Sequence, residues 1–249
     1  MIDPALREAL RAAAAAPVLL VASDYDGTLS PIVGDPAAAV PHEPALTALI
    51  EVCDLPDVHG MIISGRSLDV LAQLTGAPQS ITLIGSHGAQ ASGSSPAGPE
   101  QERTIADLND ALERVARSHE GAVLESKPSG AALHYRHSAD PTAVLSAVEG
   151  IAARSDARVI EGKKVVEFVV GEGDKGTAVD HHRHVVEADR VVFFGDDVTD
   201  EDVFAVLGPV DIGVKVGSEP SLAQFRVDDP EGVADALRLL VSERRPLSR

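Results

Sequence analysis

The chain has 249 residues, 44% of them hydrophobic, and its 39 Asp and Glu residues against 21 Lys and Arg residues give a formal net charge of −18. This length allows one large hydrophobic core or two modest ones. Nucleic acids and anionic membranes repel such an acidic surface, so we expect neither as a partner. The longest nearly apolar run, residues 12–22, is too short to span a bilayer and contains Pro17.

The same run could be mistaken for a secretion leader. Asp3 and Glu8 oppose the basic start of a leader, and cleavage would remove the strand that presents Asp24. A single cysteine, Cys53, excludes an internal disulfide and suits a reducing compartment. We therefore expect a cytoplasmic protein in which Cys53 is a buried structural thiol.

Helices and strands are predicted to alternate along the first 92 residues. In chain order, the pattern predicts a helix over 4–16, a strand over 18–23, a loop over 30–41, a helix over 43–53, a strand over 59–63, a helix over 68–74 and a strand over 81–84. This alternation is typical of a parallel sheet with right-handed crossovers.

The composition changes at residues 91–99, which are rich in Ser, Gly and Pro and form the best domain boundary. Beyond it the pattern predicts a helix over 100–119, strands over 122–126 and 130–135, a helix over 141–154, and strands over 158–160 and 164–170. Paired strands joined by short turns with glycine indicate an antiparallel sheet backed by two helices.

The strand and helix alternation resumes after Gly173. The pattern predicts a helix over 175–185, a strand over 190–194, a helix over 200–206, a strand over 210–214, a short strand over 225–227 and a helix over 232–242. We therefore expect an α/β fold with a discontinuous core, residues 1–92 and 173–249, built on a parallel sheet. A smaller α+β cap, residues 93–172, is inserted into this core.

Two acids, Asp24 and Asp26, follow the first predicted strand. Ligands of open α/β sheets bind at the carboxyl ends of the strands, where both carboxylates can face the substrate while Tyr25 turns away. One carboxylate could be a nucleophile toward phosphorus, and the other a general acid and then a base. Gly27 permits a bend, and Thr28 can donate to a phosphate oxygen. An acidic loop whose side chains only cap a turn is the alternative.

A second acidic cluster, Asp196, Asp197 and Asp200, follows the strand predicted over 190–194. Two acidic clusters at strand ends of one sheet repel each other and need a divalent cation, and oxygen ligands together with phosphate favour Mg²⁺. We expect Asp196 to bind the metal directly. Asp200 is expected to cap the next helix and to orient the residues that bind the metal. Asp197 is expected to have a role intermediate between direct metal binding and this indirect support.

Two further strand ends fit an anion site. Ser64, Gly65 and Arg66 offer a hydroxyl and backbone N–H groups at the start of a helix. Lys175 opens a helix and can neutralise a phosphate oxygen and restrain the nucleophile. Taken singly, Ser64 could be an ordinary N-cap and Lys175 a solvated lysine. It is their order along the chain with the two acidic clusters that indicates phosphoryl transfer.

These motifs are similar to those of a known superfamily. Asp24-x-Asp26-Gly27-Thr28, Ser64, Lys175 and Gly195-Asp196-Asp197-x-x-Asp200, in this order, resemble the four motifs of the haloacid dehalogenase superfamily of phosphatases, whose Rossmannoid core carries an inserted cap. The longer segments SDYDGTLSPI, IISGR, GSHGAQ, ALHYRH, KKVVEF, DKGTAV and GDDVTDED resemble the trehalose-6-phosphate phosphatase family across nearly the whole chain.

The resemblance implies Mg²⁺-dependent hydrolysis of trehalose 6-phosphate, the last step of trehalose biosynthesis. Asp24 would attack phosphorus to form an aspartyl-phosphate, and Asp26 would protonate the departing sugar oxygen and then activate water. Mg²⁺ would bind Asp24, the backbone carbonyl of Asp26, and Asp196. Lys175 and the metal would offset the charge of the phosphate against the carboxylates.

The resemblance also implies contacts to the disaccharide or its phosphate. The matching positions are Glu125, Lys127, Lys163 and Glu167 in the cap, and Arg66 and His87 in the core. Carboxylates suit sugar hydroxyls because each accepts several hydrogen bonds. Each cap residue could also be a solvent-facing strand position. Enzymes that act on sucrose phosphate or mannosyl-phosphoglycerate share the four motifs, so the identity of the phosphosugar stays open.

Two other functions would use some of the same residues. Gly171-x-Gly173-x-x-Gly176 after a strand imitates a dinucleotide fingerprint, but it would leave Asp24 and Asp26 idle. A receiver-like signalling domain also uses a phosphorylated Asp, a Ser or Thr and a Lys on a parallel sheet. Such a domain needs neither a second Asp nor a cap.

A histidine group, His181, His182 and His184, lies on the helix predicted over 175–185. Neighbouring positions on a helix point in different directions, so we expect a solvated face and not a metal site. The expected partner is a small phosphosugar substrate, and a monomer is favoured.

Overall fold

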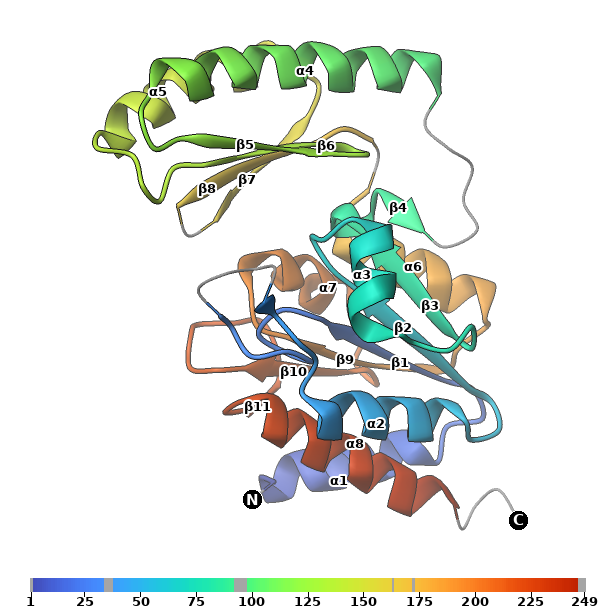
Figure 1. The fold of residues 1–249 in the computed structure, drawn as a ribbon. Helices are drawn as coiled ribbons and strands as arrows, with labels where there is room; N and C mark the ends of the chain where they lie inside the picture. Colours follow the sequence, from blue (N-terminus) through green and yellow to red (C-terminus); the bar gives the residue numbers. More distant parts are fainter. Residues whose placement is uncertain (1, 34–37, 92–97, 163, 172, 246–249) are drawn as a thin grey trace. The chain divides into compact units, whose positions relative to one another are not determined.

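The structure is a computed structural model that describes residues 2–33, 38–91, 98–162, 164–171 and 173–245. The chain divides into two compact units, one formed by residues 1–92 and 173–249 and the other by residues 93–172. Each unit buries hydrophobic clusters of its own. Figure 1 shows the chain leaving the first unit after β4 and returning to it at α6.

The larger unit contains a seven-stranded sheet in the order β11-β10-β9-β1-β2-β3-β4. Its strands are β1 (Leu19–Asp24), β2 (Val58–Ile63), β3 (Ile81–Gly85), β4 (Gln90–Ala91), β9 (Arg190–Gly195), β10 (Ile212–Val216) and β11 (Phe225–Val227). All neighbours pair in parallel except β3 and β4. β1 is central and buried along its whole length, as expected for a parallel strand covered on both faces.

Helices cover both faces of this sheet. The helices on one face are α1 (Pro4–Ala14), α2 (Glu43–Cys53), α3 (Leu68–Thr75) and α8 (Pro230–Arg244), and those on the other are α6 (Lys175–Val185) and α7 (Glu201–Val206). Successive side chains of β1 point to opposite faces of the sheet, which explains why both faces are covered. Leu19 and Val21 pack in the first layer, and Leu20 and Ala22 pack in the second. The predicted α/β core with a parallel sheet is therefore confirmed.

The smaller unit is a four-stranded antiparallel sheet in the order β5-β6-β8-β7, backed by two helices. Its elements are α4 (Pro99–Ser118), β5 (Val123–Lys127), β6 (Gly130–His134), α5 (Pro141–Ala152), β7 (Arg158–Gly162) and β8 (Val165–Val169). Leu112 of α4 and Val144 of α5 join the cluster of Leu133 and Phe168 on one face of this sheet. Side chains that alternate with these, such as Glu125 and Glu167, therefore project from the opposite face.

One predicted strand is shifted in the structure, and two predicted segments lie partly outside the described residues. The strand expected over 210–214 is β10, Ile212–Val216, because the carboxylate of Asp211 accepts the N–H groups of Gly208 and Val191 and forms a turn before it. The predicted boundary at 91–99 begins with the short antiparallel strand β4, and residues 92–97 of it lie outside the described residues. Part of the predicted loop over 30–41, residues 34–37, also lies outside them.

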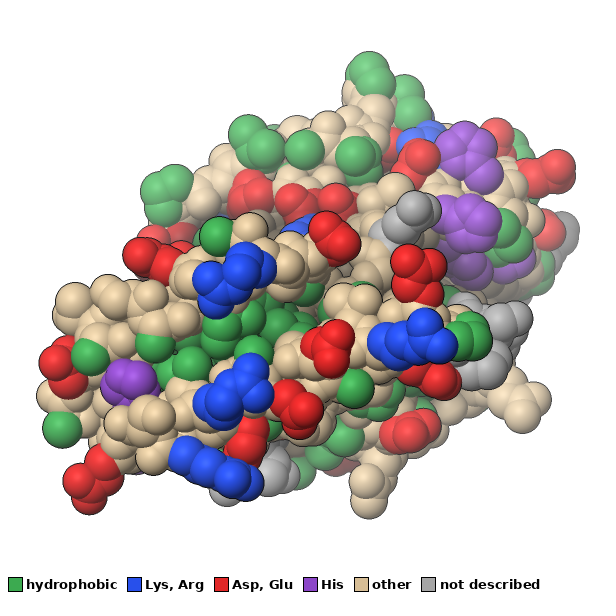
Figure 2. All heavy atoms as spheres, turned by 90° about the horizontal axis from the view of Figure 1, so that it is seen from above, with side chains coloured by type: hydrophobic (Ala, Val, Ile, Leu, Met, Phe, Trp, Pro, Cys, Tyr) green, Lys and Arg blue, Asp and Glu red, His purple; other side chains and the backbone are tan. Residues whose placement is uncertain are grey.

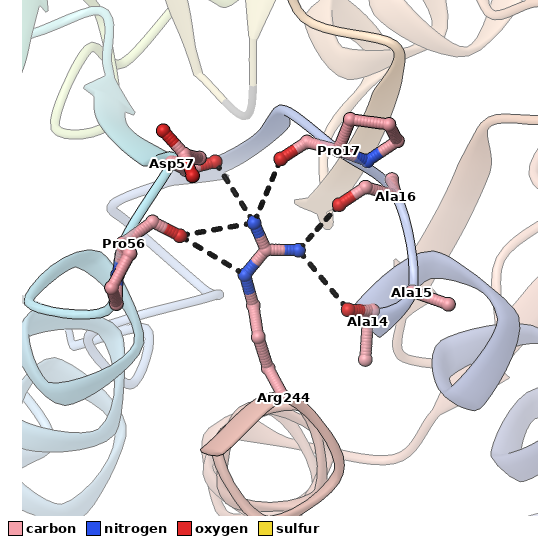
Figure 3. Close-up of a pocket in the computed structure, with 7 residues that line it drawn as sticks. All are labelled: Ala14, Ala15, Ala16, Pro17, Pro56, Asp57 and Arg244. Atoms are coloured by element: carbon pink, nitrogen blue, oxygen red, sulfur yellow. Dashed lines mark hydrogen bonds between the residues drawn. The ribbon is translucent and has the colours of Figure 1, made fainter. Parts of the chain in front are cut away.

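Arg244, near the end of α8, connects segments at the amino ends of β1 and β2 (Figure 3). Its guanidinium donates hydrogen bonds to the carbonyl oxygens of Ala14, Ala16, Pro17, Pro56 and Asp57 at 2.7 to 3.3 Å. The side chain is buried and lines a cavity of about 230 Å³. Because backbone carbonyls accept the hydrogen bonds of this guanidinium, we interpret Arg244 as a structural residue. It joins these segments at the sheet edge opposite the acidic clusters.

Candidate active site

The carboxyl edge of the central sheet gathers most of the predicted site residues. β1 pairs in parallel with β2 on one side and β9 on the other, in registers that align Asp24 with Ile63 and Ser23 with Phe194. Asp24 ends β1, Ser64 follows β2, and Asp196 follows β9. The three loops after these strands therefore meet at one edge, as parallel strands require.

Lys175 joins the two acidic clusters. Its ammonium Nζ donates to Asp24 Oδ1 at 2.6 Å and to Asp200 Oδ1 at 2.8 Å, and all three side chains are at least 96% buried. Lys175 is the first residue of α6, whose start is held by a capping box between Asp174 and Thr177. The alternative reading of Lys175 as a solvated surface lysine is thus wrong.

Burial and mutual repulsion dominate the electrostatics of this cluster. Burial raises the pKa of Asp24 well above its usual value, and Lys175 only partly opposes this. Burial, followed by the charges of Asp200 and Asp197, raises the pKa of Asp196 to about 7. For Lys175, burial lowers the pKa, but the charges of Asp200 and Asp24 outweigh it, so the net direction is upward. The positive charge of Lys175 therefore does not fully compensate the carboxylates of this site.

A divalent cation fits this deficit. One carboxylate oxygen from each of Asp24, Asp196 and Asp200 lies within 4.8 Å of the others, and this is the single such acid or histidine group found among the described residues. Asp196 Oδ1 is buried and has no hydrogen-bond partner within the described part of the chain. Both Asp200 oxygens are occupied, Oδ1 by Lys175 and Oδ2 by the N–H groups of Asp196 and Asp197. Asp24 and Asp196 are therefore the carboxylates best able to hold a cation, and their oxygens suit Mg²⁺.

Gly27 makes room for the second acidic cluster. Its φ angle is +83°, and a Cβ atom there would lie 2.1 Å from Asp196 Oδ2. The Asp196 carboxylate therefore packs directly against the backbone of the turn after β1. A residue larger than glycine at position 27 would clash with it.

The acidic loop after β9 differs from the expectation in one detail. Asp197 is the N-cap of the short 3₁₀ turn η3 (Val198–Asp200) and accepts the N–H of Val198. Asp200 was expected to cap the next helix, but α7 has no side-chain cap bond from it. Its carboxylate instead reaches backward to the part-buried N–H groups of residues 196 and 197 and across to the buried ammonium of Lys175, which needs a partner.

Asp26 pairs with Arg66, and it does not belong to the group of acids found among the described residues, Asp24, Asp196 and Asp200. The guanidinium of Arg66 donates from Nε and Nη2 to the two carboxylate oxygens of Asp26, at 2.7 and 2.6 Å, and stacks 5.5 Å from the centroid of the Tyr25 ring. Tyr25, which was expected to turn away from the substrate, is buried in the core, and its hydroxyl donates to the carbonyl of Ala39.

Hydroxyl groups and a histidine surround the same edge. Thr28 Oγ1 is buried without a hydrogen-bond partner in the described residues, and the buried Ser64 hydroxyl accepts the N–H of Arg66 at 3.1 Å. The buried ring of His87 packs on Gly65, where a Cβ atom would lie 2.4 Å from it. His87 has a φ angle of +53°, and its N–H donates to the carbonyl of Ser64, which joins the loops after β2 and β3.

The predicted cap residues share one face of the smaller sheet. Lys127 Nζ lies 2.6 Å from Glu167 Oε1, and His134 Nε2 lies 2.8 Å from Glu125 Oε2. The hydrogen bond from His134 lowers the pKa of Glu125, against the effect of burial. Glu125 and Glu167 both align with Ala132 of the strand between them. Lys163 lies outside the described residues.

The histidine group and the single cysteine noted from the sequence lie apart from the acidic clusters. His181 and His184 are exposed while His182 is half-buried, where burial lowers its pKa, and the three do not form one of the metal-ligating groups found within the described ranges. Cys53 is buried, as predicted, and burial raises its pKa to about 12.

Sequence reasoning missed Lys215. This buried lysine of β10 donates from Nζ to the backbone carbonyl of Asp196 at 2.6 Å. The available signal was a charged residue in the middle of the apolar strand Ile-Gly-Val-Lys-Val.

Residues 22–231 match the sequence profile described as trehalose-phosphatase. The chain belongs to the trehalose-phosphatase family. It is 34% identical over 243 residues to a trehalose-phosphate phosphatase of Mycobacterium marinum, covering 88% of this chain and 60% of that protein. It is also 34% identical to a bifunctional trehalose-6-phosphate synthase/phosphatase of Thermoproteus tenax, with coverage of 91% and 32%. This member of the family thus spans less than two thirds of the length of either relative.

Solved structures agree on the fold of this family member. The C-terminal domain of trehalose-6-phosphate phosphatase from C. albicans superposes with a TM-score of 0.76 at 25% identity, covering 96% of each chain. A haloacid dehalogenase-like hydrolase from Bacteroides thetaiotaomicron, at 14% identity, gives a TM-score of 0.66 over 89% of this chain and 98% of its own, which concerns the fold alone. The expected haloacid dehalogenase-like fold is confirmed. Among the described residues, the helices are all too short or too polar to cross a membrane.

Proposed function

We propose that this chain hydrolyses trehalose 6-phosphate to trehalose and inorganic phosphate in a Mg²⁺-dependent reaction, the last step of trehalose biosynthesis. Membership of the trehalose-phosphatase family supports the substrate. The observation that carries the chemistry is the Lys175 ammonium held between the carboxylates of Asp24 and Asp200. A buried carboxylate can stay ionised and attack phosphorus only if such a cation offsets its charge.

In the first step, a carboxylate oxygen of Asp24 attacks phosphorus while the bond between phosphorus and the sugar oxygen breaks. Asp26 donates a proton to that oxygen, so trehalose leaves as an alcohol and Asp24 becomes an aspartyl-phosphate. In the second step, water attacks phosphorus and gives a proton to Asp26, which restores its acid form. The bond to Asp24 breaks and phosphate leaves.

The residues that would hold Mg²⁺ are Asp24, Asp196 and the backbone carbonyl of Asp26, with Asp197 and Asp200 ordering the loop behind them. When bound, the cation supplies positive charge to the phosphoryl oxygens. The raised pKa values of Asp24 and Asp196 and the orphaned Oδ1 of Asp196 support this assignment.

The phosphate itself would be bound by neutral donors and one guanidinium. Thr28 contributes a hydroxyl that is buried without a partner within the described ranges, and Ser64 contributes a second hydroxyl. Gly65 offers a backbone N–H in the loop after β2. Arg66 is paired with Asp26 in this structure, and a dianionic phosphate would compete for that guanidinium. Release of Asp26 from Arg66 would then accompany substrate binding.

The smaller unit would select the sugar. Glu125, Lys127, Lys163 and Glu167 are proposed to contact the disaccharide or its phosphate, together with His87 of the larger unit. The described cap residues pair with other charged side chains of the same sheet face, Lys127 with Glu167 and Glu125 with His134, and sugar hydroxyls could take over some of these hydrogen bonds. In this proposal, residues 1–92 and 173–249 form the catalytic core and residues 93–172 the specificity cap of a cytoplasmic monomer.

Phosphate release from a panel of phosphosugars tests this function. The panel contains trehalose 6-phosphate, sucrose 6-phosphate, mannosyl-3-phosphoglycerate and mannose 6-phosphate, each assayed with Mg²⁺ and with EDTA. Trehalose 6-phosphate should dominate by orders of magnitude, EDTA should abolish turnover, and Asp24→Asn should be inactive. A flat profile would overturn the substrate assignment, and full activity of Asp24→Asn would overturn the mechanism.

A further inference from the structure

Lys215 is a buried cation that the reaction above does not use. Its side chain is 3% exposed, between Val214 and Val216 of β10, which are themselves buried. An ammonium group in such a place costs free energy unless polar partners compensate for it. An apolar side chain of the same volume would avoid that cost. A lysine at this position therefore indicates a function, and its contacts show where that function lies.

The contacts of Lys215 centre on Asp196. Nζ donates to the backbone carbonyl of Asp196 at 2.6 Å and lies 3.6 Å from Glu201 Oε1. In the sheet, Lys215 is the register partner of Gly195, which immediately precedes Asp196. The lysine is therefore held by its own strand next to the point where β9 turns into the acidic loop.

The backbone of Asp196 is held from two sides. Its N–H donates to Asp200 Oδ2 at 2.8 Å, and its carbonyl accepts from Lys215. Since both peptide groups that flank its Cα atom are restrained, the direction in which its side chain leaves the backbone is restrained as well. That direction carries the carboxylate to Gly27, where a Cβ atom would come within 2.1 Å of Oδ2.

Glu201 keeps Lys215 in place. Its Oε2 accepts the N–H of Leu222 at 2.7 Å, while Oε1 faces the ammonium. Glu201 opens α7, and Leu222 lies between β10 and β11. The ammonium of Lys215 thus contacts the acidic loop directly and the start of α7 through Glu201. Glu201 in turn binds the segment after β10.

We propose that Lys215 is a positioning residue that, together with Asp200, orients the Asp196 carboxylate and thereby sets the affinity of the site for a divalent cation. This inference rests on the proposed metal site but not on the identity of the phosphosugar. Groups that orient a metal ligand without touching the metal commonly change metal affinity by tenfold to hundredfold when they are removed.

The test is the affinity for Mg²⁺ without substrate, measured by the shift of the unfolding temperature across a Mg²⁺ titration and by calorimetry. Lys215→Met keeps the length of the side chain and removes its charge and its donors. We expect its Mg²⁺ dissociation constant to rise about tenfold to hundredfold. Lys215→Arg, which keeps a charge and donors, should recover part of that loss. Lys164→Met removes the same charge from an exposed position of the smaller unit and should leave the affinity unchanged.

Wild-type Mg²⁺ affinity in Lys215→Met would overturn the proposal, as would an equal loss in Lys164→Met. Circular dichroism in EDTA verifies that each variant is folded. If Lys215→Met does not fold, Lys215→Gln, which keeps a donor but no charge, takes its place with the same criterion. Normal Mg²⁺ binding by a wild-type chain that does not hydrolyse trehalose 6-phosphate would overturn the proposed function and leave the role of Lys215 standing.

Discussion

Arg66 holds both carboxylate oxygens of Asp26, at 2.6 and 2.7 Å, in a pair that no other acid of the site joins among the described residues. This arrangement gives the acid that is proposed to move protons a partner different from that of the acid proposed to attack phosphorus. Asp24 is paired with a buried lysine, whereas Asp26 is 43% exposed and paired with a planar guanidinium. Two neighbouring acids thus have two environments, which a nucleophile and a proton donor require.

The first prediction concerns Asp26. Asp26→Asn should lower kcat/KM for trehalose 6-phosphate by about 10²-fold to 10⁴-fold, because a sugar oxygen needs a proton to leave. For p-nitrophenyl phosphate the loss should be much smaller, since p-nitrophenolate leaves without one. Steady-state kinetics with both substrates measures the difference.

Arg66→Lys is the companion variant, because a lysine keeps the charge but cannot hold both carboxylate oxygens. It should lower the activity toward both substrates through weaker phosphate binding, and lower the activity toward the disaccharide phosphate further through the loss of the pair with Asp26. Equal losses on the two substrates would contradict a role of the Arg66 and Asp26 pair in proton transfer.

The second prediction concerns pH in the absence of metal. Burial raises the pKa of Asp196 to about 7, so between pH 4 and pH 7 the folded chain holds a proton that the unfolded chain has released. The free energy of unfolding should therefore fall as pH rises through this range, by at most about 1.4 kcal/mol per pH unit for one such carboxyl. Above pH 7 the effect of this group should level off. Urea unfolding in EDTA at several pH values measures it.

Asp196→Asn is the control for this pH dependence, because an amide does not titrate. It should flatten the slope and raise the stability of the metal-free chain near pH 7. Mg²⁺ should stabilise the wild-type chain at pH 7.5 and have little effect on this variant. An unchanged slope in Asp196→Asn would show that other groups produce it.

The third prediction concerns the cap sheet. Glu167 is 11% exposed on its side chain and pairs with Lys127 at 2.6 Å. Glu167→Ala should reduce turnover of trehalose 6-phosphate more than that of p-nitrophenyl phosphate, which offers no sugar hydroxyls. Glu161→Ala, at an exposed position of β7, is the matched control and should affect neither substrate. A parallel loss on both substrates in Glu167→Ala would count against sugar recognition by this residue.

The fourth prediction concerns the junction at Arg244. Arg244→Met leaves the carbonyls at the amino ends of β1 and β2 without their shared donor and should lower the free energy of unfolding by about 2 to 4 kcal/mol. Arg245→Met, whose side chain is 62% exposed, should change it by less than about 0.5 kcal/mol. Chemical unfolding measures both. The Mg²⁺ affinity of Arg244→Met should stay normal, since the junction and the acidic clusters lie at opposite edges of the sheet.

The distribution of charge over the surface explains why the site depends on local cations. On the face drawn in Figure 2, acidic side chains are spread widely, and Lys and Arg side chains lie singly or in small groups among them. With a formal net charge of −18, the chain as a whole repels a phosphate. Lys175, Arg66 and a divalent cation would have to overcome that repulsion at short range.

The alternation of predicted strands and helices along the chain, and the abrupt end of the first strand in Asp24, were sufficient to predict the parallel sheet and the edge at which the acids lie. Local patterns carry this information because apolar periodicity and strand ends depend on neighbouring residues. The order of the motifs at residues 24–28, 64, 175 and 196–200 resembled that of the haloacid dehalogenase superfamily, and the longer segments GDDVTDED and ALHYRH resembled the family to which the chain belongs.

Contacts between distant segments were decided by the tertiary structure. Asp200 turns back to the backbone of Asp196 and to Lys175 instead of capping α7, and Lys215 reaches the carbonyl of Asp196 from the neighbouring strand. The spacing of residues along one segment does not determine which buried donor a carboxylate will meet. That choice depends on the strand order β10-β9-β1, which brings these groups together in the interior, where a polar group without a partner costs free energy.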